Sequence, residues 1–198
     1  MMDLLICIPV VVFLLPALCL VVKIVQAIQA PGPLFERETR AGLRNRPFRV
    51  FSFRTRKVTN DTTPKETTTE QPYPFGPLLR RRGLDQAPQF LNVLLGRMSV
   101  VGPQPRQIIH NRRFREIMDK YQVRTFAKPG ITGLAQINGF RGEAKTDLDV
   151  VEGAKLDIEY IENWSLPLDL SIILKAVMQL LKPPMAGYQR FYSSGTRT

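Results

Sequence analysis

An uncharged apolar run near the N-terminus limits what this chain can fold into. Residues 4–22 contain no charged side chain, and as an α-helix they would extend about 28 Å, close to the hydrocarbon thickness of a bilayer. A run of this length and composition is typical of a helix surrounded by lipid rather than of a buried helix in a soluble core. The sequence therefore predicts a membrane-embedded helix within residues 1–30.

The path of that helix through the membrane has two interpretations. Pro16 lies inside the run, where it removes one backbone hydrogen bond and bends a helix. The helix either spans the bilayer with a tolerated proline, or is broken near Pro16 and re-enters on the side from which it came. A signal peptide fits poorly, because the start "MMD" has no Lys or Arg. Basic residues follow the run, so the positive-inside rule places the main body in the cytoplasm under either interpretation.

Composition restricts the partners of the main body. The 198 residues carry a formal net charge of +11, which favours an anionic partner: nucleic acid, anionic lipid or a phosphorylated small molecule. Both cysteines, Cys7 and Cys19, lie in the apolar run, and there is one histidine, His110. A disulfide framework and a Cys- or His-ligated metal site are therefore excluded.

The chain after the apolar run is expected to form one cytoplasmic domain, residues 31–182, with a short tail at 183–198. "APGPLFERE" reads as a turn leading into an extended stretch. "RPFRVFSFRT" alternates Phe48, Val50 and either Phe51 or Phe53 with basic residues, as a half-buried strand does. The Thr- and Pro-rich stretch at 59–74 has no apolar periodicity, so we predict a mobile loop there.

A single carboxylate, Asp85, follows three arginines in "RRRGLDQAPQF". Pro77 is expected to open a short helix before it, and Pro88 to occupy the first turn of the next helix, which Gly96 ends. Asp85 would then precede a helix N-terminus, where exposed N–H groups favour anions. It either caps that helix and pairs with a neighbouring arginine, or is a carboxylate in a phosphate-binding site, serving as nucleophile or magnesium ligand.

The C-terminal half offers weaker signals. Glycines in "KPGITGLAQINGFRG" permit close backbone approach to a ligand, but they match no phosphate-binding motif. Asp157, Glu159 and Glu162 are either metal ligands or a solvated helix face, and the solvated face is favoured. Asp169 is a candidate N-cap of a broadly apolar helix that is either buried or lies in a membrane interface. In the interfacial interpretation, Ile173 and Val177 face the bilayer.

Five blocks follow one another along the chain: "APGPLFERETRAG", "FSFRT", "LLRRRGLDQAPQFLNVLLGRMSVVGPQP", "KPGITGLAQINGFRGE" and "LDIEYIENWSLPLDLSIILKAV". In this order they resemble the bacterial sugar transferases, the monotopic phosphoglycosyl transferases. The last two blocks look most like the subgroup that primes exopolysaccharide or lipopolysaccharide synthesis. The resemblance implies an α+β fold: a small membrane-associated catalytic domain with an N-terminal re-entrant (or spanning) helix and interfacial amphipathic helices.

The resemblance also implies a two-step reaction. A UDP-sugar gives its sugar phosphate to Asp85 and releases UMP, and undecaprenyl phosphate or another polyprenyl phosphate then takes the sugar phosphate. Arg80 would hold a phosphate, and Arg54 and Arg141 match recurrent family positions and are expected to bind substrate. Mg²⁺ is the implied cofactor, with Asp85 and Asp157 as its ligands. The enzyme is expected at the bacterial inner (cytoplasmic) membrane in contact with membrane lipid, its catalytic domain facing the cytoplasm, with no nucleic acid as partner.

Four residues depart from the family pattern. Gln86 replaces a catalytic Glu, Ser52 a Lys, Gln104 an Arg in the substrate-binding set, and Leu15 a Ser. Gln86 can neither take up a proton nor give a metal a charged ligand. Three hypotheses follow: a working phosphoglycosyl transferase, a catalytically impaired relative that binds nucleotide-sugar or pathway partners, and a membrane-tethered nucleic-acid binder suggested by charge alone.

Overall fold

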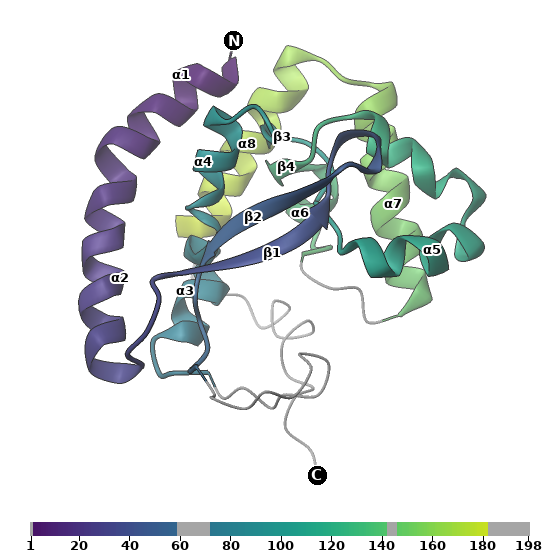
Figure 1. The fold of residues 1–198 in the computed structure, drawn as a ribbon. Coiled ribbons are helices and arrows are strands. Elements are labelled where there is room, and N and C mark those ends of the chain that lie inside the picture. Colours follow the sequence, from purple (N-terminus) through teal and green to yellow (C-terminus); the bar gives the residue numbers. More distant parts are fainter. Residues whose placement is uncertain (1, 59–71, 142–145, 182–198) are drawn as a thin grey trace.

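The computed structural model describes residues 2–58, 72–141 and 146–181, and they form a mostly helical mixture of helices and short strands (Figure 1). This confirms a mixed helix and sheet fold with one apolar N-terminal helix. Its elements are α1 (Met2–Pro9), α2 (Leu15–Gln29), β1 (Phe35–Ala41), β2 (Pro47–Phe53), α3 (Gly76–Arg82), α4 (Gln89–Leu94), β3 (Ser99–Val101), α5 (Ile108–Ile117), β4 (Gly130–Thr132), α6 (Leu134–Ile137), α7 (Asp147–Glu162) and α8 (Leu166–Leu181).

The N-terminal helix is continuous from Met2 to Gln29, with α1 and α2 joined by a π-helical turn at Val10–Leu14. Pro16 is the second residue after this turn, and because it lacks an N–H the regular hydrogen-bond pattern is interrupted there. The helix bends into an arc along one side of the molecule (Figure 1). Its most apolar 18-residue stretch has a mean hydropathy of 3.1, and a helix of 28 residues, about 42 Å, is long enough to cross a bilayer.

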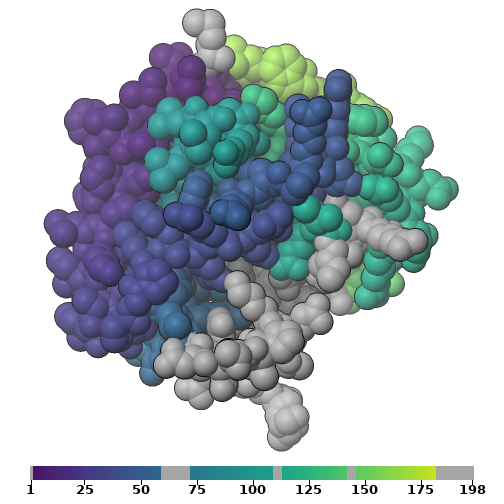
Figure 2. All heavy atoms as spheres, viewed as in Figure 1, coloured from purple at the N-terminus to yellow at the C-terminus, as the bar shows by residue number. Residues whose placement is uncertain are grey.

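One face of this helix packs on the body along its whole length. The buried positions are Cys7, Leu15, Val22 and Gln26, spaced so that they share one side of the helix. The opposite side is apolar and exposed, and the atoms of the helix form one entire edge of the molecule (Figure 2). An apolar outer face of this size would be costly in water and suits contact with lipid.

Hydrogen bonds also fix both ends of the helix to the body. Near its start, the Asp3 carboxylate accepts from the Ser99 hydroxyl at 2.9 Å and from the Val100 backbone N–H at 2.9 Å. Near its end, Gln26 Nε2 donates to the Arg54 carbonyl at 2.9 Å. The two ends of the arc are therefore held by the same folded unit.

Two small sheets cross the body. β1 and β2 pair antiparallel from Phe35↔Phe53 to Ala41↔Pro47, which confirms the predicted strand. Phe53 is the buried aromatic, whereas Phe51 is half-buried beneath the Arg37 guanidinium, 5.4 Å from the ring centre. β3 and β4 pair in parallel, with α5 in the connection between them, as a parallel pair requires.

Three glycines let the segments after β3 and around β4 touch. A Cβ at Gly130 would lie 2.1 Å from the Gly102 backbone nitrogen, and one at Gly133 would lie 2.2 Å from the Gly102 carbonyl oxygen. Two of them, Gly130 and Gly133, were expected to let a ligand approach the backbone. The structure shows instead that they let two backbone segments pack against each other.

The last helix, α8, begins earlier than predicted. Asp169 is not its N-cap but lies one turn inside, where its buried carboxylate accepts from the Tyr160 hydroxyl at 2.8 Å and from the Trp164 indole N–H at 3.2 Å. Ile173, expected to face the bilayer, packs against the core, whereas Val177 is exposed. The exposed apolar stripe of α8 consists of Leu166, Leu170, Leu174, Val177, Met178 and Leu181.

The predicted domain limits are not tested by this fold. Of the loop expected at 59–74, residues 59–71 lie outside the described residues, as does the tail at 183–198. Residues 31–58 and 72–181, where described, share contacts throughout and surround common apolar clusters. The boundaries at 30 and 182 stay predictions.

Candidate active site

Asp85 lies in a 3₁₀ turn, Leu84–Gln86, between α3 and α4. α3 begins at Gly76, and Pro77 lies in its first turn, close to the predicted start. Gly83 ends the helix with a φ of 66°, a left-handed conformation that glycine adopts without strain. Leu84 and Ala87, on either side of Asp85, pack against the cluster that contains Leu15 and Val22 of the N-terminal helix. The apolar helix therefore supports the turn that carries Asp85.

The Asp85 carboxylate is held in an unusual state. Its Oδ1 is buried and has no hydrogen-bond partner among the described residues. Burial raises the pKa of Asp85 to about 6, against the opposing effect of Arg80 first, then of the neighbouring backbone N–H groups, and then of Arg141. Asp85 forms no ion pair with Arg81 or Arg82 in the described part of the chain, so the capping interpretation is wrong.

Arg141 reaches this site from the loop after α6, and α8 holds it. Arg141 Nη2 donates to Gln179 Oε1 at 3.0 Å, and Arg141 Nε donates to the Gln136 carbonyl at 3.3 Å. In the same turn of α8, the Leu180 carbonyl accepts from Arg82 Nη1 at 3.0 Å. The sequence prediction assigned neither residue to the site, because Gln179 stands in no recognisable motif and Arg82 was considered only as an ion-pair partner of Asp85.

Gln86 is next to Asp85 in the turn. Its backbone N–H donates to the Gly83 carbonyl at 3.3 Å, and its half-buried side chain makes no hydrogen bond to any described residue. A free amide at this position can donate to a phosphoryl oxygen, but it cannot carry a proton away. The structure thus brings together Asp85, Gln86, Arg80 and Arg141 of the predicted site.

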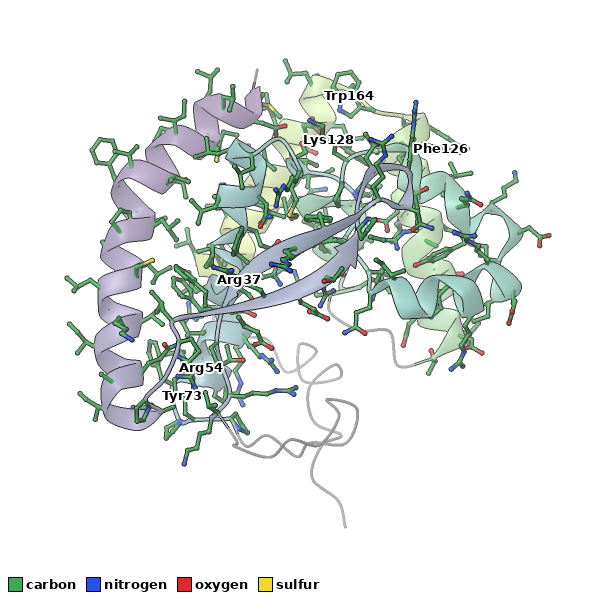
Figure 3. All side chains as sticks on the ribbon, in the orientation of Figure 1. Arg37, Arg54, Tyr73, Phe126, Lys128 and Trp164 are labelled. Carbon is green, nitrogen blue, oxygen red and sulfur yellow. The ribbon has the colours of Figure 1, made fainter. Side chains whose placement is uncertain are left out.

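Arg54 has a different environment from the one expected. Its guanidinium donates to three backbone carbonyls, those of Pro33 at 2.9 Å, Arg56 at 2.6 Å and Ala30. The Tyr73 hydroxyl donates to the Arg54 carbonyl at 2.9 Å, and the two side chains lie close together at one end of the molecule (Figure 3). Arg54 therefore fastens the connection between α2 and β1. The expectation that Arg54 binds substrate stays a prediction.

Asp157, expected as a second metal ligand, is instead half of a buried ion pair. Its Oδ2 accepts from Arg124 Nη2 at 2.7 Å and from Arg124 Nε at 3.1 Å. Burial raises the pKa of Asp157, and Arg124 opposes that shift. No group of three or more potential metal ligands occurs in the described residues. Glu159 and Glu162 are exposed, so the solvated-face interpretation holds for them and fails for Asp157.

Gln104 belongs to the same buried region as Asp157. Its carbonyl accepts from Arg124 Nη2 at 2.7 Å, and its side-chain Oε1 is buried without a partner among the described residues. With Arg106 and Arg124 it lines a cavity of about 20 Å³, room for about one water molecule. The structure places Gln104 beside this arginine pair and shows no contact between it and Asp85.

Comparison with known proteins identifies similar chains. The family model described as bacterial sugar transferase matches residues 1–183. The chain is 41% identical over 167 residues to the UDP-glucose:undecaprenyl-phosphate glucose-1-phosphate transferase of Escherichia coli (strain K12), covering 83% of this chain and 36% of that protein. It is 40% identical over 168 residues to the protein of the same name from Xanthomonas campestris pv. campestris, covering 83% and 35%.

A third relative is matched over most of its own length. The exopolysaccharide production protein PSS of Rhizobium leguminosarum bv. phaseoli is 34% identical over 171 residues, which cover 82% of this chain and 84% of that protein. By contrast, this chain spans only about a third of the length of the Escherichia and Xanthomonas relatives.

Proposed function

The chain belongs to the bacterial sugar transferase family, and we propose that it transfers a sugar phosphate from a UDP-sugar to a polyprenyl phosphate at a membrane, through a covalent intermediate on Asp85. The names of its relatives support a UDP-sugar donor and an undecaprenyl phosphate acceptor. The observation that carries the proposal is the buried Asp85 carboxylate, whose Oδ1 has no partner among the described residues although Arg80 and Arg141 act on it.

The reaction divides into two displacements at one phosphorus atom. An Asp85 oxygen attacks the phosphorus that bears the sugar, the bond to the bridging oxygen breaks, and UMP leaves with the electron pair. An oxygen of polyprenyl phosphate then attacks the same phosphorus, and the Asp85 oxygen leaves as a carboxylate. The products are UMP and a polyprenyl diphosphate sugar. Two steps allow one site to serve a soluble donor and a lipid acceptor in turn.

Asp85 is suited to the first displacement because it is ionised and poorly solvated. With a pKa of about 6, about nine in ten molecules carry the carboxylate at pH 7. A carboxylate whose Oδ1 is buried and unbonded has less hydration to lose when it attacks. Attack by a carboxylate also needs no general base, so this step is compatible with Gln86 in place of a Glu.

The neighbouring cations would bind the donor. Arg80 and Arg141 come from different elements and both act on Asp85, so a diphosphate at Asp85 would lie between them. A guanidinium presents a planar pair of donors that matches a phosphate. We assign Arg80 and Arg141 to the phosphates, and the Gln86 amide to a phosphoryl oxygen of the transferred group.

The donor atoms at Asp85 fit a magnesium ion. Mg²⁺ is usually bound by one or two carboxylates together with substrate phosphates, and the unpartnered Asp85 Oδ1 supplies one such oxygen. The Gln86 amide oxygen is the neighbouring neutral ligand. Bound there, the ion would neutralise charge on the diphosphate and on the departing UMP. Asp157 has no part in this assignment, since Arg124 occupies its carboxylate.

The attachment of the N-terminal helix supports a re-entrant path. A spanning helix has its ends on opposite sides of a hydrocarbon layer about 30 Å thick. Here the carboxylate of Asp3 and the amide of Gln26 both bind the same folded body. We propose that the body lies on the cytoplasmic side of the inner membrane, with the outer face of the helix in lipid.

Gln86 favours one alternative, an impaired relative that binds nucleotide-sugar without turnover. Because it offers neither a negative ligand nor a proton acceptor, a Mg²⁺ site built here has one charge fewer than a site with Glu. Weaker magnesium binding would slow both displacements. The two functions differ in whether UMP is released.

The test is incubation of the detergent-solubilised protein with UDP-sugars, Mg²⁺ and undecaprenyl phosphate, with UMP release and a protein-bound sugar phosphate measured separately. We expect Asp85→Asn to lose both signals, whereas Asp119→Asn, an exposed carboxylate, should keep both. Turnover by Asp85→Asn would refute the covalent mechanism. Donor binding without UMP release in wild type would favour the impaired relative.

A further inference from the structure

Helix α8 contacts the candidate active site and also presents an apolar surface. Its exposed stripe runs from Leu166 to Leu181 along the outside of the helix. Its last turn meets two arginines near Asp85, through the Gln179 side chain and the Leu180 carbonyl. These contacts link residues 38 and 98 positions apart in the chain, so α8 joins segments that no local motif connects.

The Gln179 amide is fixed at both of its ends. Oε1 accepts from Arg141 Nη2 at 3.0 Å, and Nε2 donates to the Ile137 carbonyl at 2.8 Å. A flipped amide would set its NH₂ group against the guanidinium and its oxygen against the carbonyl, and both contacts would be repulsive. The orientation of the amide, and with it the direction of the Arg141 guanidinium, is therefore determined by the fold.

A neutral acceptor is well suited to this task. A carboxylate in the same place would bind Arg141 more strongly, but would also cancel the charge that attracts a phosphate. An apolar side chain would leave the charge and lose the orientation. An amide orients the guanidinium and leaves its positive charge available at Asp85.

We propose that Gln179 is a positioning residue for donor binding, which it promotes by holding Arg141 toward the Asp85 site. The inference deepens the proposed function and rests on it for the identity of the donor. Gln179 need not touch the donor. Its effect passes through Arg141, and α8 thereby contributes to the site although it carries none of the reacting groups.

The test compares Gln179→Met with wild type in UDP binding and in UMP release from UDP-glucose. Met keeps the length and volume of Gln but makes no such hydrogen bond. We expect the Kd for UDP and the KM for the donor to rise about tenfold, within the range for losing a hydrogen bond to a charged group, while kcat changes less. Lys175→Met, an exposed position one turn earlier on α8, is the matched control and should match wild type in every measurement.

A double-mutant cycle separates positioning from general packing. If Gln179 acts through Arg141, Gln179→Met should have no further effect on UDP binding in an Arg141→Met background. Equal effects in both backgrounds would overturn the inference. Should Gln179→Met fail to fold, Gln179→Glu replaces it; this variant keeps the acceptor but cancels charge, and unchanged UDP binding would also overturn the inference.

The same experiment distinguishes the two proposals. If wild type turns over and Gln179→Met keeps the wild-type KM, the inference about Gln179 fails alone. If wild type binds UDP with the expected cycle but never releases UMP, the proposed reaction fails and the positioning role stands.

Discussion

Replacing Asp157 with Asn should destabilise the protein strongly without touching the donor site. The Asp157 and Arg124 side chains are only 5% and 6% exposed, so the substitution leaves a buried guanidinium without its counter-charge. Breaking a buried pair in this way costs about 3–5 kcal/mol. Arg106 adds to the cost. Burial, and to a smaller extent the positive charge of the nearby Arg124, lower the pKa of Arg106 to about 10. Asp157 is the carboxylate that offsets the charges of both arginines.

The expected loss is large enough to measure by thermal unfolding. For a chain of this size, about 2–4 °C of Tm is lost per kcal/mol, so Asp157→Asn should unfold about 6–20 °C below wild type. Circular dichroism of the solubilised protein at several Mg²⁺ concentrations is the assay. Glu159→Gln, an exposed position on the same helix, is the control and should leave Tm unchanged.

The resemblance to the family implied that Asp157 binds metal. The same thermal-unfolding assay can refute the ion-pair reasoning. A variant with wild-type Tm and a raised magnesium requirement would make Asp157 a metal ligand. A second check is the double variant Asp157→Leu/Arg124→Met, which removes both charges and should be more stable than Asp157→Asn.

Three further outcomes are expected. Because burial raises the pKa of Asp85 to about 6, the carboxylate forms as pH rises through 6. At limiting Mg²⁺, kcat/KM measured at pH 5 should therefore be about tenfold lower than its plateau value at higher pH, and saturating Mg²⁺ should shift this dependence to lower pH. A pH-independent rate would contradict the nucleophile assignment. Gln86→Glu should lower the Mg²⁺ concentration needed for half-maximal UMP release, and an unchanged requirement would remove Gln86 from the metal site. Leu170→Glu/Leu174→Glu should weaken liposome flotation, whereas Ile173→Ala should lower Tm instead; full retention on liposomes would show that the exposed stripe of α8 does not contact lipid.

Local sequence patterns predicted the helices and strands that are determined by residues close together in the chain. The apolar run predicted the N-terminal helix, alternation predicted β2, and Pro77 and Gly96 marked a helix start and a helix end. The start of α8 was misplaced, because Ser165 accepts from the Leu168 N–H at 3.4 Å while Asp169 binds two aromatic side chains instead. A polar residue near a helix start can serve either as a cap or as a partner in the core, and local sequence does not separate the two.

The candidate site was predictable only where family motifs cover it. Asp85 and its arginines were named through the resemblance, and the structure brings Arg80 and Arg141 to Asp85. The bond between Gln179 and Arg141 was not predictable, because its partners are 38 residues apart and meet only when α8 packs on the loop after α6. Arg54 lies in the family motif "FSFRT", but the motif did not predict that its guanidinium donates to backbone carbonyls.

The packing of the Asp85 turn on the N-terminal helix has a consequence for engineering. Deleting residues 1–30 to obtain a water-soluble protein would remove the helix that packs behind Leu84 and Ala87, and with it the support that fixes the position of Asp85. Replacing exposed apolar residues on the outer face of that helix is the better route. Polar substitutions at Leu5, Phe13 and Ile28, all at least 75% exposed, would weaken the affinity for lipid and leave the inner contacts in place. In this protein the apolar helix is also part of the structure that holds the candidate active site.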